Sequence, residues 1–70
     1  ISLIEVEGRA KDRVVDALSG FAEITAIHTT SGQWDLIAEL STESLTALDA
    51  LLHRIRLVPG VGASETHLLL

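Results

Sequence analysis

The hydrophobic residues of this 70-residue chain repeat with two different periods, and the order in which the periods follow one another restricts the possible folds. In residues 1–7, apolar and polar residues alternate, which is typical of a strand. In residues 9–19, the apolar residues are spaced by three and four instead, so they share one face of a helix. Gly20 follows directly and is expected to end this helix.

Residues 22–40 have the pattern of a β-hairpin. Residues 22–30 are rich in β-branched side chains, which favour a strand. Ser31 and Gly32 interrupt the pattern, and residues 33–40 resume it, so two strands are expected around a short turn. A period of two places alternate residues of the second strand on one face, namely Trp34, Leu36, Ala38 and Leu40. The opposite face carries Asp35, Ile37 and Glu39.

A second helix and a last strand complete the chain. Ser41 or Thr42 is expected to cap the helix, because a hydroxyl accepts readily from the first free N–H groups. The helix is predicted from an apolar stripe at helical spacing, formed by Leu45, Leu48, Leu51, Leu52 and Ile55. Pro59 and Gly60 end the helix, and residues 63–70 are expected to form the final strand.

The resulting order is β-α-β-β-α-β within a single domain of residues 1–70. This order predicts an α+β fold of the ferredoxin-like kind, an antiparallel sheet with both helices on one face. Alternation places Leu3, Ile37 and Leu69 on the other face, and no part of the chain remains to cover them. We therefore expect a second copy to cover this face, so that the protein is a dimer.

Composition excludes several classes of protein. The formal net charge is −5, from five Lys and Arg against ten Asp and Glu, so this chain is not expected to bind nucleic acid directly. No cysteine is present for a disulfide or a thiolate metal site. No apolar run approaches the roughly 18–20 residues of a membrane helix, and a cytoplasmic location is expected. Because the sequence begins at Ile1, we expect that a preceding segment is missing.

Two segments carry a resemblance to a known family. Residues 31–40 read SGQWDLIAEL, and residues 58–70 read VPGVGASETHLLL. Together they resemble the effector-binding domain of the Lrp/AsnC family, also called the RAM domain. In that family a small residue, a glycine, a variable polar residue, an aromatic residue and an aspartate precede an apolar strand. A helix then leads to a Pro-Gly-Val turn and a Ser/Thr-Glu-Thr strand, so the resemblance spans the whole chain.

The resemblance implies a ligand-sensing, oligomerising module of a transcriptional regulator. Family members usually carry a helix-turn-helix domain before this module, and they form dimers through their sheets and rings of four or five dimers, octamers or decamers. An amino acid or related small effector binds in the clefts between dimers, and no cofactor is implied. The expected partners are therefore the chain itself, the effector and full-length Lrp/AsnC regulators.

The turn at residues 31–35 is the main candidate for the effector site. Ser31, Gly32 and Gln33 would cradle a carboxylate through their N–H groups, although Gly32 would equally serve only to supply a positive φ. Asp35 would meet the ammonium group, or would be either a solvated residue that opens a strand or a cap of the turn backbone. Trp34 would line the cleft, but a place in the hydrophobic core is the favoured interpretation. Since the family commonly has Tyr at this position, a hydroxyl is missing here.

Further polar residues are candidate ligands. Ser64 and Thr66 share a strand face and would complete the cleft as the family's last strand does, or Thr66 simply favours a strand. His28, His53 and His67 show no close pairing and no supporting cysteine, so no metal site is predicted. A role at the surface or an interface is the favoured interpretation of His28, with the border of the effector cleft as the alternative.

Catalysis receives little support, because no nucleophile elbow, phosphate loop or paired-carboxylate motif is present, and we expect a protein that is not an enzyme. One alternative is a small ferredoxin-like enzyme acting on a tetrapyrrole, a decarboxylase or monooxygenase, with His28 and His67 at the macrocycle. Another is the ACT domain, an amino-acid-binding module with a glycine-rich first strand-helix turn, where this chain has only Gly8. Fold alone does not separate these alternatives.

Overall fold

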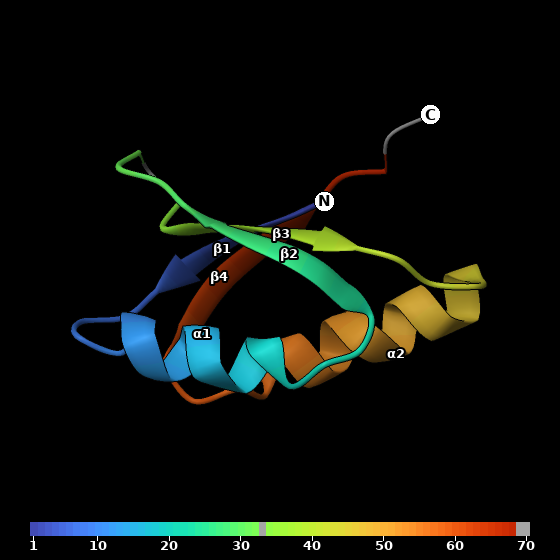
Figure 1. The fold of residues 1–70 in the computed structure, drawn as a ribbon, viewed down its shortest axis with the longest axis horizontal. Coiled ribbons are helices and arrows are strands. Elements are labelled where there is room, and N and C mark those ends of the chain that lie inside the picture. The colour runs from blue at the N-terminus through green and yellow to red at the C-terminus, as the bar shows by residue number, and fades with distance from the viewer. Residues whose placement is uncertain (33, 69–70) are drawn as a thin grey trace.

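A computed structural model describes residues 1–32 and 34–68 of the chain (Figure 1). The elements follow one another as β1 (Ser2–Val6), α1 (Lys11–Ser19), β2 (Ile24–Thr29), β3 (Leu36–Leu40), α2 (Leu45–Arg56) and β4 (Val61–Thr66). The predicted order β-α-β-β-α-β is therefore confirmed.

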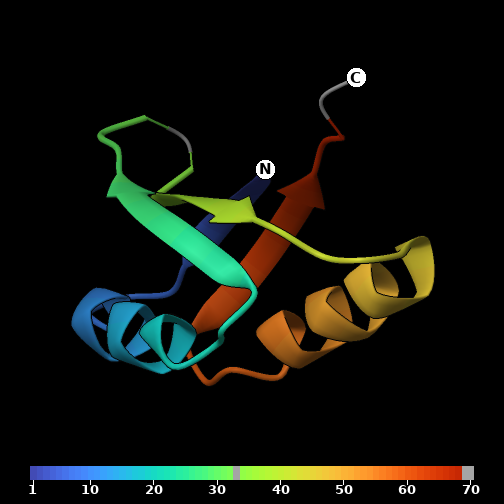
Figure 2. The same cartoon turned by 45° about the vertical axis from the view of Figure 1, so that its right-hand side comes forward.

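The four strands form one sheet in the order β2-β3-β1-β4, and each neighbouring pair is antiparallel. Both helices lie on the same face of this sheet, as Figures 1 and 2 show from two directions. The α+β fold of the ferredoxin-like kind is thus confirmed. β1 and β3 are central, so each is paired on both sides and joins the two halves of the chain.

The hydrophobic core lies between the sheet and the helices. Ile4, Leu36 and Ala38 point from the central strands toward the helices, and all three are fully buried. The helices contribute four more fully buried residues, which are Val14, Leu18, Leu51 and Ile55. These residues come from the periodic positions that predicted the elements. Burial of such side chains contributes roughly 1.5–3 kcal/mol each, which makes this layer the main source of stability.

The other face of the sheet carries a mixed row of side chains. His28 is opposite Ile37, Ile37 is opposite Leu3, and Leu3 is opposite Glu65, so one row crosses all four strands. Leu3 and Ile37, at its centre, are half-buried, and no helix covers them. Their predicted place on the open face is confirmed, whereas Leu69 lies outside the described residues.

Several predicted boundaries differ from the structure. The second helix begins at Leu45, and its cap is Ser44, whose Oγ accepts from the N–H of Ala47 at 3.0 Å; the predicted caps Ser41 and Thr42 are wrong. Ser44 is the cap because its side chain reaches the N–H of Ala47, three residues later, which is the usual bond of a helix cap. β4 begins at Val61, two residues earlier than predicted, and ends at Thr66.

Candidate functional site

The turn between β2 and β3 is held by Thr30. Its N–H donates to the carbonyl of Asp35 at 3.0 Å and closes the hairpin. Its Oγ1 donates to the carbonyl of Trp34 at 2.7 Å and accepts from the N–H of Gly32 at 2.9 Å. The predicted site residues did not include Thr30. The tendency of Thr hydroxyls to bond backbone groups close by in sequence is the signal that points to it.

Asp35 ties the turn to the end of β1. Its Oδ2 accepts from the N–H of Val6 at 2.8 Å, across 29 positions of sequence, and Asp35 itself is half-buried. The aspartate thus stabilises backbone structure, though that of β1 and not that of its own turn. A carboxylate has room for several hydrogen bonds on its two oxygens, so this contact leaves Asp35 able to accept from a ligand as well.

Gly32 does not supply the positive φ that a tight hairpin turn requires. The described glycines with positive φ are Gly8 at 54° and Gly60 at 97°, so the alternative in which Gly32 supplies a positive φ is wrong. A Cβ placed on Gly32 would meet only Thr30 Oγ1, at an ordinary distance of 3.5 Å. Ser31 and Gly32 are both exposed, and Gln33, the third predicted cradle residue, lies outside the described residues.

Trp34 is not part of the core. β3 begins only at Leu36, so Trp34 lies in the turn and not on the predicted strand face with Leu36 and Ala38. It is half-buried and absent from the cluster of residues that pack against the core. The favoured interpretation of Trp34 as a core residue is therefore wrong. A partly exposed indole at a turn is instead typical of a residue that contacts a ligand or a second protein.

Ser64 and Thr66 lie apart from this turn. Both are half-buried on the helix-covered side, where Ser64 is opposite Ile4 and Thr66 is opposite Ser2. The hydroxyls of Thr66 and Ser2 lie 3.0 Å apart and share a hydrogen bond. Since Asp35 contacts Val6 at the far end of β1, one copy of the chain does not bring Thr66 to the turn. A site that contains both requires a second copy.

A groove of about 380 Å³ lies between α1 and β2 on the surface of the described residues, and two further grooves are slightly larger. One, of about 400 Å³, lies where β3 leaves the sheet and is lined by Thr66 together with Ile1, Thr25, Glu39, Leu40, Ser41, Thr42, Leu48, His67 and Leu68. The other, of about 430 Å³, lies between α1 and the turn before β4. Neither is lined by a described residue of the turn 31–35.

Comparison with known protein families identifies the family of this chain. The family model of the Lrp/AsnC ligand binding domain matches residues 1–70, the whole chain. The chain belongs to the Lrp/AsnC ligand-binding domain family. A comparison with curated protein sequences returned no match. The family assignment agrees with the fold and with the two motifs, and it makes this Lrp/AsnC domain a ligand-sensing regulatory module.

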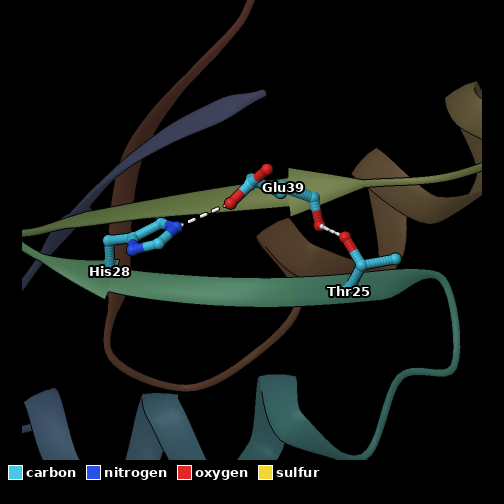
Figure 3. Close-up of polar contacts among 3 residues, drawn as sticks. All are labelled: Thr25, His28 and Glu39. Carbon is cyan, nitrogen blue, oxygen red and sulfur yellow. Dashed lines mark hydrogen bonds and ion pairs between the residues drawn. The ribbon is translucent and has the colours of Figure 1, made fainter.

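Two of the three histidines of this Lrp/AsnC domain, His28 and His67, pair with glutamates at the edges of the open face. His28 Nε2 lies 2.6 Å from Glu39 Oε2, and Thr25 Oγ1 donates to the carbonyl of Glu39 at 3.2 Å (Figure 3). His67 Nε2 lies 3.1 Å from Glu65 Oε1. More than half of the His28 side chain is exposed, 57%, as expected of a histidine at the surface or at an interface.

His28 and His67 do not form a common site in one copy. His28 is on β2 and His67 follows β4, and these are the two edge strands of the sheet. Three strand spacings separate the edges, about 14 Å. Within residues 1–32 and 34–68, no three His, Asp or Glu side chains come close enough to hold a metal ion. Across the same residues, no helix has both the length and the apolar character to cross a membrane.

Proposed function

We propose that this Lrp/AsnC domain is the effector-sensing and oligomerising part of a cytoplasmic transcriptional regulator, that it binds a free amino acid or a close analogue, and that it is not an enzyme. The observation that carries the proposal is the match of the Lrp/AsnC ligand binding domain to residues 1–70. The formal net charge of −5 is in keeping with a module that leaves DNA contact to another domain.

The unit of assembly is a dimer through the open sheet face, and four or five dimers form a ring. Leu3 and Ile37 support this, because they form an apolar centre that the chain's own helices do not cover. His28 and Glu65 flank that centre at the two edge strands, which gives the face the apolar middle and polar border of a protein interface.

The effector binds at the turn 31–35, in a cleft between dimers. Its ammonium group faces the Asp35 carboxylate, which keeps acceptor capacity beyond the bond to Val6. Its carboxylate lies against the backbone N–H groups of the exposed residues Ser31 and Gly32, with Gln33 as the third residue of the proposed cradle. Trp34 forms a wall of the cleft, in keeping with its partial exposure. Ser64 or Thr66 adds a hydroxyl from another copy, because its own copy holds it away from the turn.

Titration calorimetry with a panel of free amino acids tests the effector site. The informative variant is Asp35→Asn, which keeps an oxygen for the N–H of Val6 but removes the charge that faces the ammonium group. We expect the effector to bind about 1.5–3 kcal/mol more weakly, the range of a hydrogen bond to a charged group. Equal binding to both proteins would show that Asp35 has no such role. Binding of a tetrapyrrole, with no amino acid bound, would favour the enzyme alternative.

Light scattering tests the dimer. Ile37→Asp places a charge in the centre of the open face, where burial without a partner is costly, and should raise the dissociation constant of the dimer by at least tenfold. Ala22→Asp is the matched control, because it adds the same charge at an exposed position between α1 and β2. A wild-type protein that is monomeric, or an Ile37→Asp variant as dimeric as the control, would contradict the sheet-face dimer.

A further inference from the structure

The first turn of α2 presents an exposed apolar side chain between acidic residues. Leu45 is 73% exposed, the highest fraction among the large hydrophobic residues of the described chain. Glu43 and Asp49, on either side of it in sequence, are exposed as well. Asp49 is four residues after Leu45, so the two share one side of the helix. We call this surface the acidic knob, made of Glu43, Leu45 and Asp49.

The groove of about 430 Å³ has the opposite character. Its lining is mainly apolar and is formed by Ala10, Ala17, Val58, Pro59 and Gly60. Arg9 and Arg13 border it, with Glu7 as the one acidic lining residue. Arg9, Lys11 and Arg13 make up three of the chain's five basic residues. Within residues 1–32 and 34–68 none of these three forms an ion pair, so their charges remain available to a partner.

The knob and the groove lie at opposite ends of the molecule. In Figures 1 and 2, α1 begins near one end, close to the turn that leads into β4, and α2 begins at the other end. Both surfaces are outside the open sheet face, because both belong to the helix-bearing side. One copy therefore cannot place its own knob in its own groove, but the knob of a second copy is free to reach the groove of the first.

We propose that the acidic knob of one copy docks in the arginine-bordered groove of another. Leu45 then covers the apolar lining, and Glu43 and Asp49 face Arg9 and Arg13. A second copy is the occupant that fits, since every copy of this acidic chain carries both complementary surfaces. A contact between two different surfaces is heterologous, and repetition of it produces a ring or a filament. Because the sheet face stays free, this contact would join one sheet-face dimer to the next.

The proposal names the contact between the dimers of the proposed function and rests on that function. Its test is a reciprocal charge exchange, followed by native mass spectrometry and light scattering at about 50 mM salt, where charges act over more than 10 Å. The first variant is Arg9→Glu with Arg13→Glu. Like charges then face each other, and association beyond the dimer should weaken by at least about tenfold.

Adding Glu43→Arg and Asp49→Arg to the first variant restores opposite charges in the contact and should restore assembly. Leu45→Ser, which keeps all charges, should also stop growth at the dimer. Arg56→Glu is the matched control, because Arg56 is exposed but does not line the groove, and this variant should assemble as wild type does. Circular dichroism on each variant verifies that the fold is retained.

Three results would overturn the docking. The first is a wild-type protein that stops at the dimer in low salt, and the second is a fully assembled Arg9→Glu, Arg13→Glu variant. The third is a variant with all four exchanges that stays at the dimer. The proposed function fails separately, through calorimetry: assembly that depends on the knob and the groove, without binding of any amino acid, leaves the docking intact and removes the effector site.

Discussion

The turns at residues 31–35 and 58–60 each contain a glycine that contributes to the family resemblance, yet the two glycines have different surroundings. Gly60 has a φ of 97°, and a Cβ there would lie 2.5 Å from Ala10 Cβ and 3.0 Å from Val14 Cγ2. Its carbonyl also accepts from the N–H of Glu7 at 2.8 Å. Both backbone conformation and packing against α1 therefore require a glycine at this position.

At Gly32 neither requirement applies. The backbone does not need a positive φ, and a Cβ would meet one side-chain oxygen at 3.5 Å. The turn is held by Thr30 and Asp35, whose bonds would remain after a substitution of Gly32. Of the two glycine-containing motifs, the one at 58–60 therefore serves the fold. The glycine of the other is unexplained by the fold, which is what a ligand that approaches the backbone would produce.

The largest expected effect is that of Gly60→Ala. The variant combines a strained backbone with a methyl group pressed onto Ala10 and the fully buried Val14. We expect a loss of roughly 2–4 kcal/mol in the free energy of unfolding, from strain and overpacking together. Urea unfolding at a fixed protein concentration measures it, because oligomerisation makes apparent stability depend on concentration.

Gly8→Ala is the control for that measurement. Gly8 also has a positive φ, of 54°, but a Cβ there would meet nothing within 4 Å. This variant should lose only about 1 kcal/mol in the free energy of unfolding, from backbone strain alone. The difference between the two losses in unfolding free energy measures the cost of the contact with α1. Equal losses would show that packing at Gly60 is relaxed easily and that the two turns differ less than the distances indicate.

An intermediate effect is expected for Asp35→Ala. The change leaves the N–H of Val6, at the half-buried end of β1, without its carboxylate partner. A loss of about 1–2 kcal/mol in unfolding free energy follows from the value of such a bond. Asp35→Asn keeps an acceptor and should lose less than half as much by urea unfolding. If both variants unfold like wild type, then Thr30 alone holds the turn.

The elements of the fold were predictable because their signal is repeated along each segment. Two apolar stripes at helical spacing and four strand-like segments leave little choice of architecture, and the sheet order follows from it. The boundaries depend on single side chains instead. Several hydroxyls precede α2, and only the three-dimensional path of the chain shows that Ser44 is the one that caps it.

The location of the candidate site stays a prediction from the motif, and the contacts within it had no signal in the sequence. The motif around Gly32 singled out the turn, whereas the bond between Asp35 and Val6 joins residues 29 positions apart and has no local signal. Trp34 was expected in the core because it is large and apolar. Because β3 begins only at Leu36, Trp34 lies in the turn before the strand. The alternation of apolar and polar residues does not reveal where a strand begins.

The smallest expected effect on stability is that of Gly32→Ala. This variant tests whether the fold requires a glycine at position 32 as it does at position 60. Its free energy of unfolding should lie within about 0.5 kcal/mol of wild type, or slightly above it, because alanine restricts the unfolded chain and fits the native backbone. If an effector carboxylate lies against this backbone, the added methyl group should still weaken binding in calorimetry, and Gly32→Val should weaken it further. Unchanged binding in both variants would mean that the effector does not approach the turn at Gly32. A loss of stability as large as that of Gly60→Ala would mean that the fold requires both glycines, and the functional argument drawn from Gly32 would no longer hold.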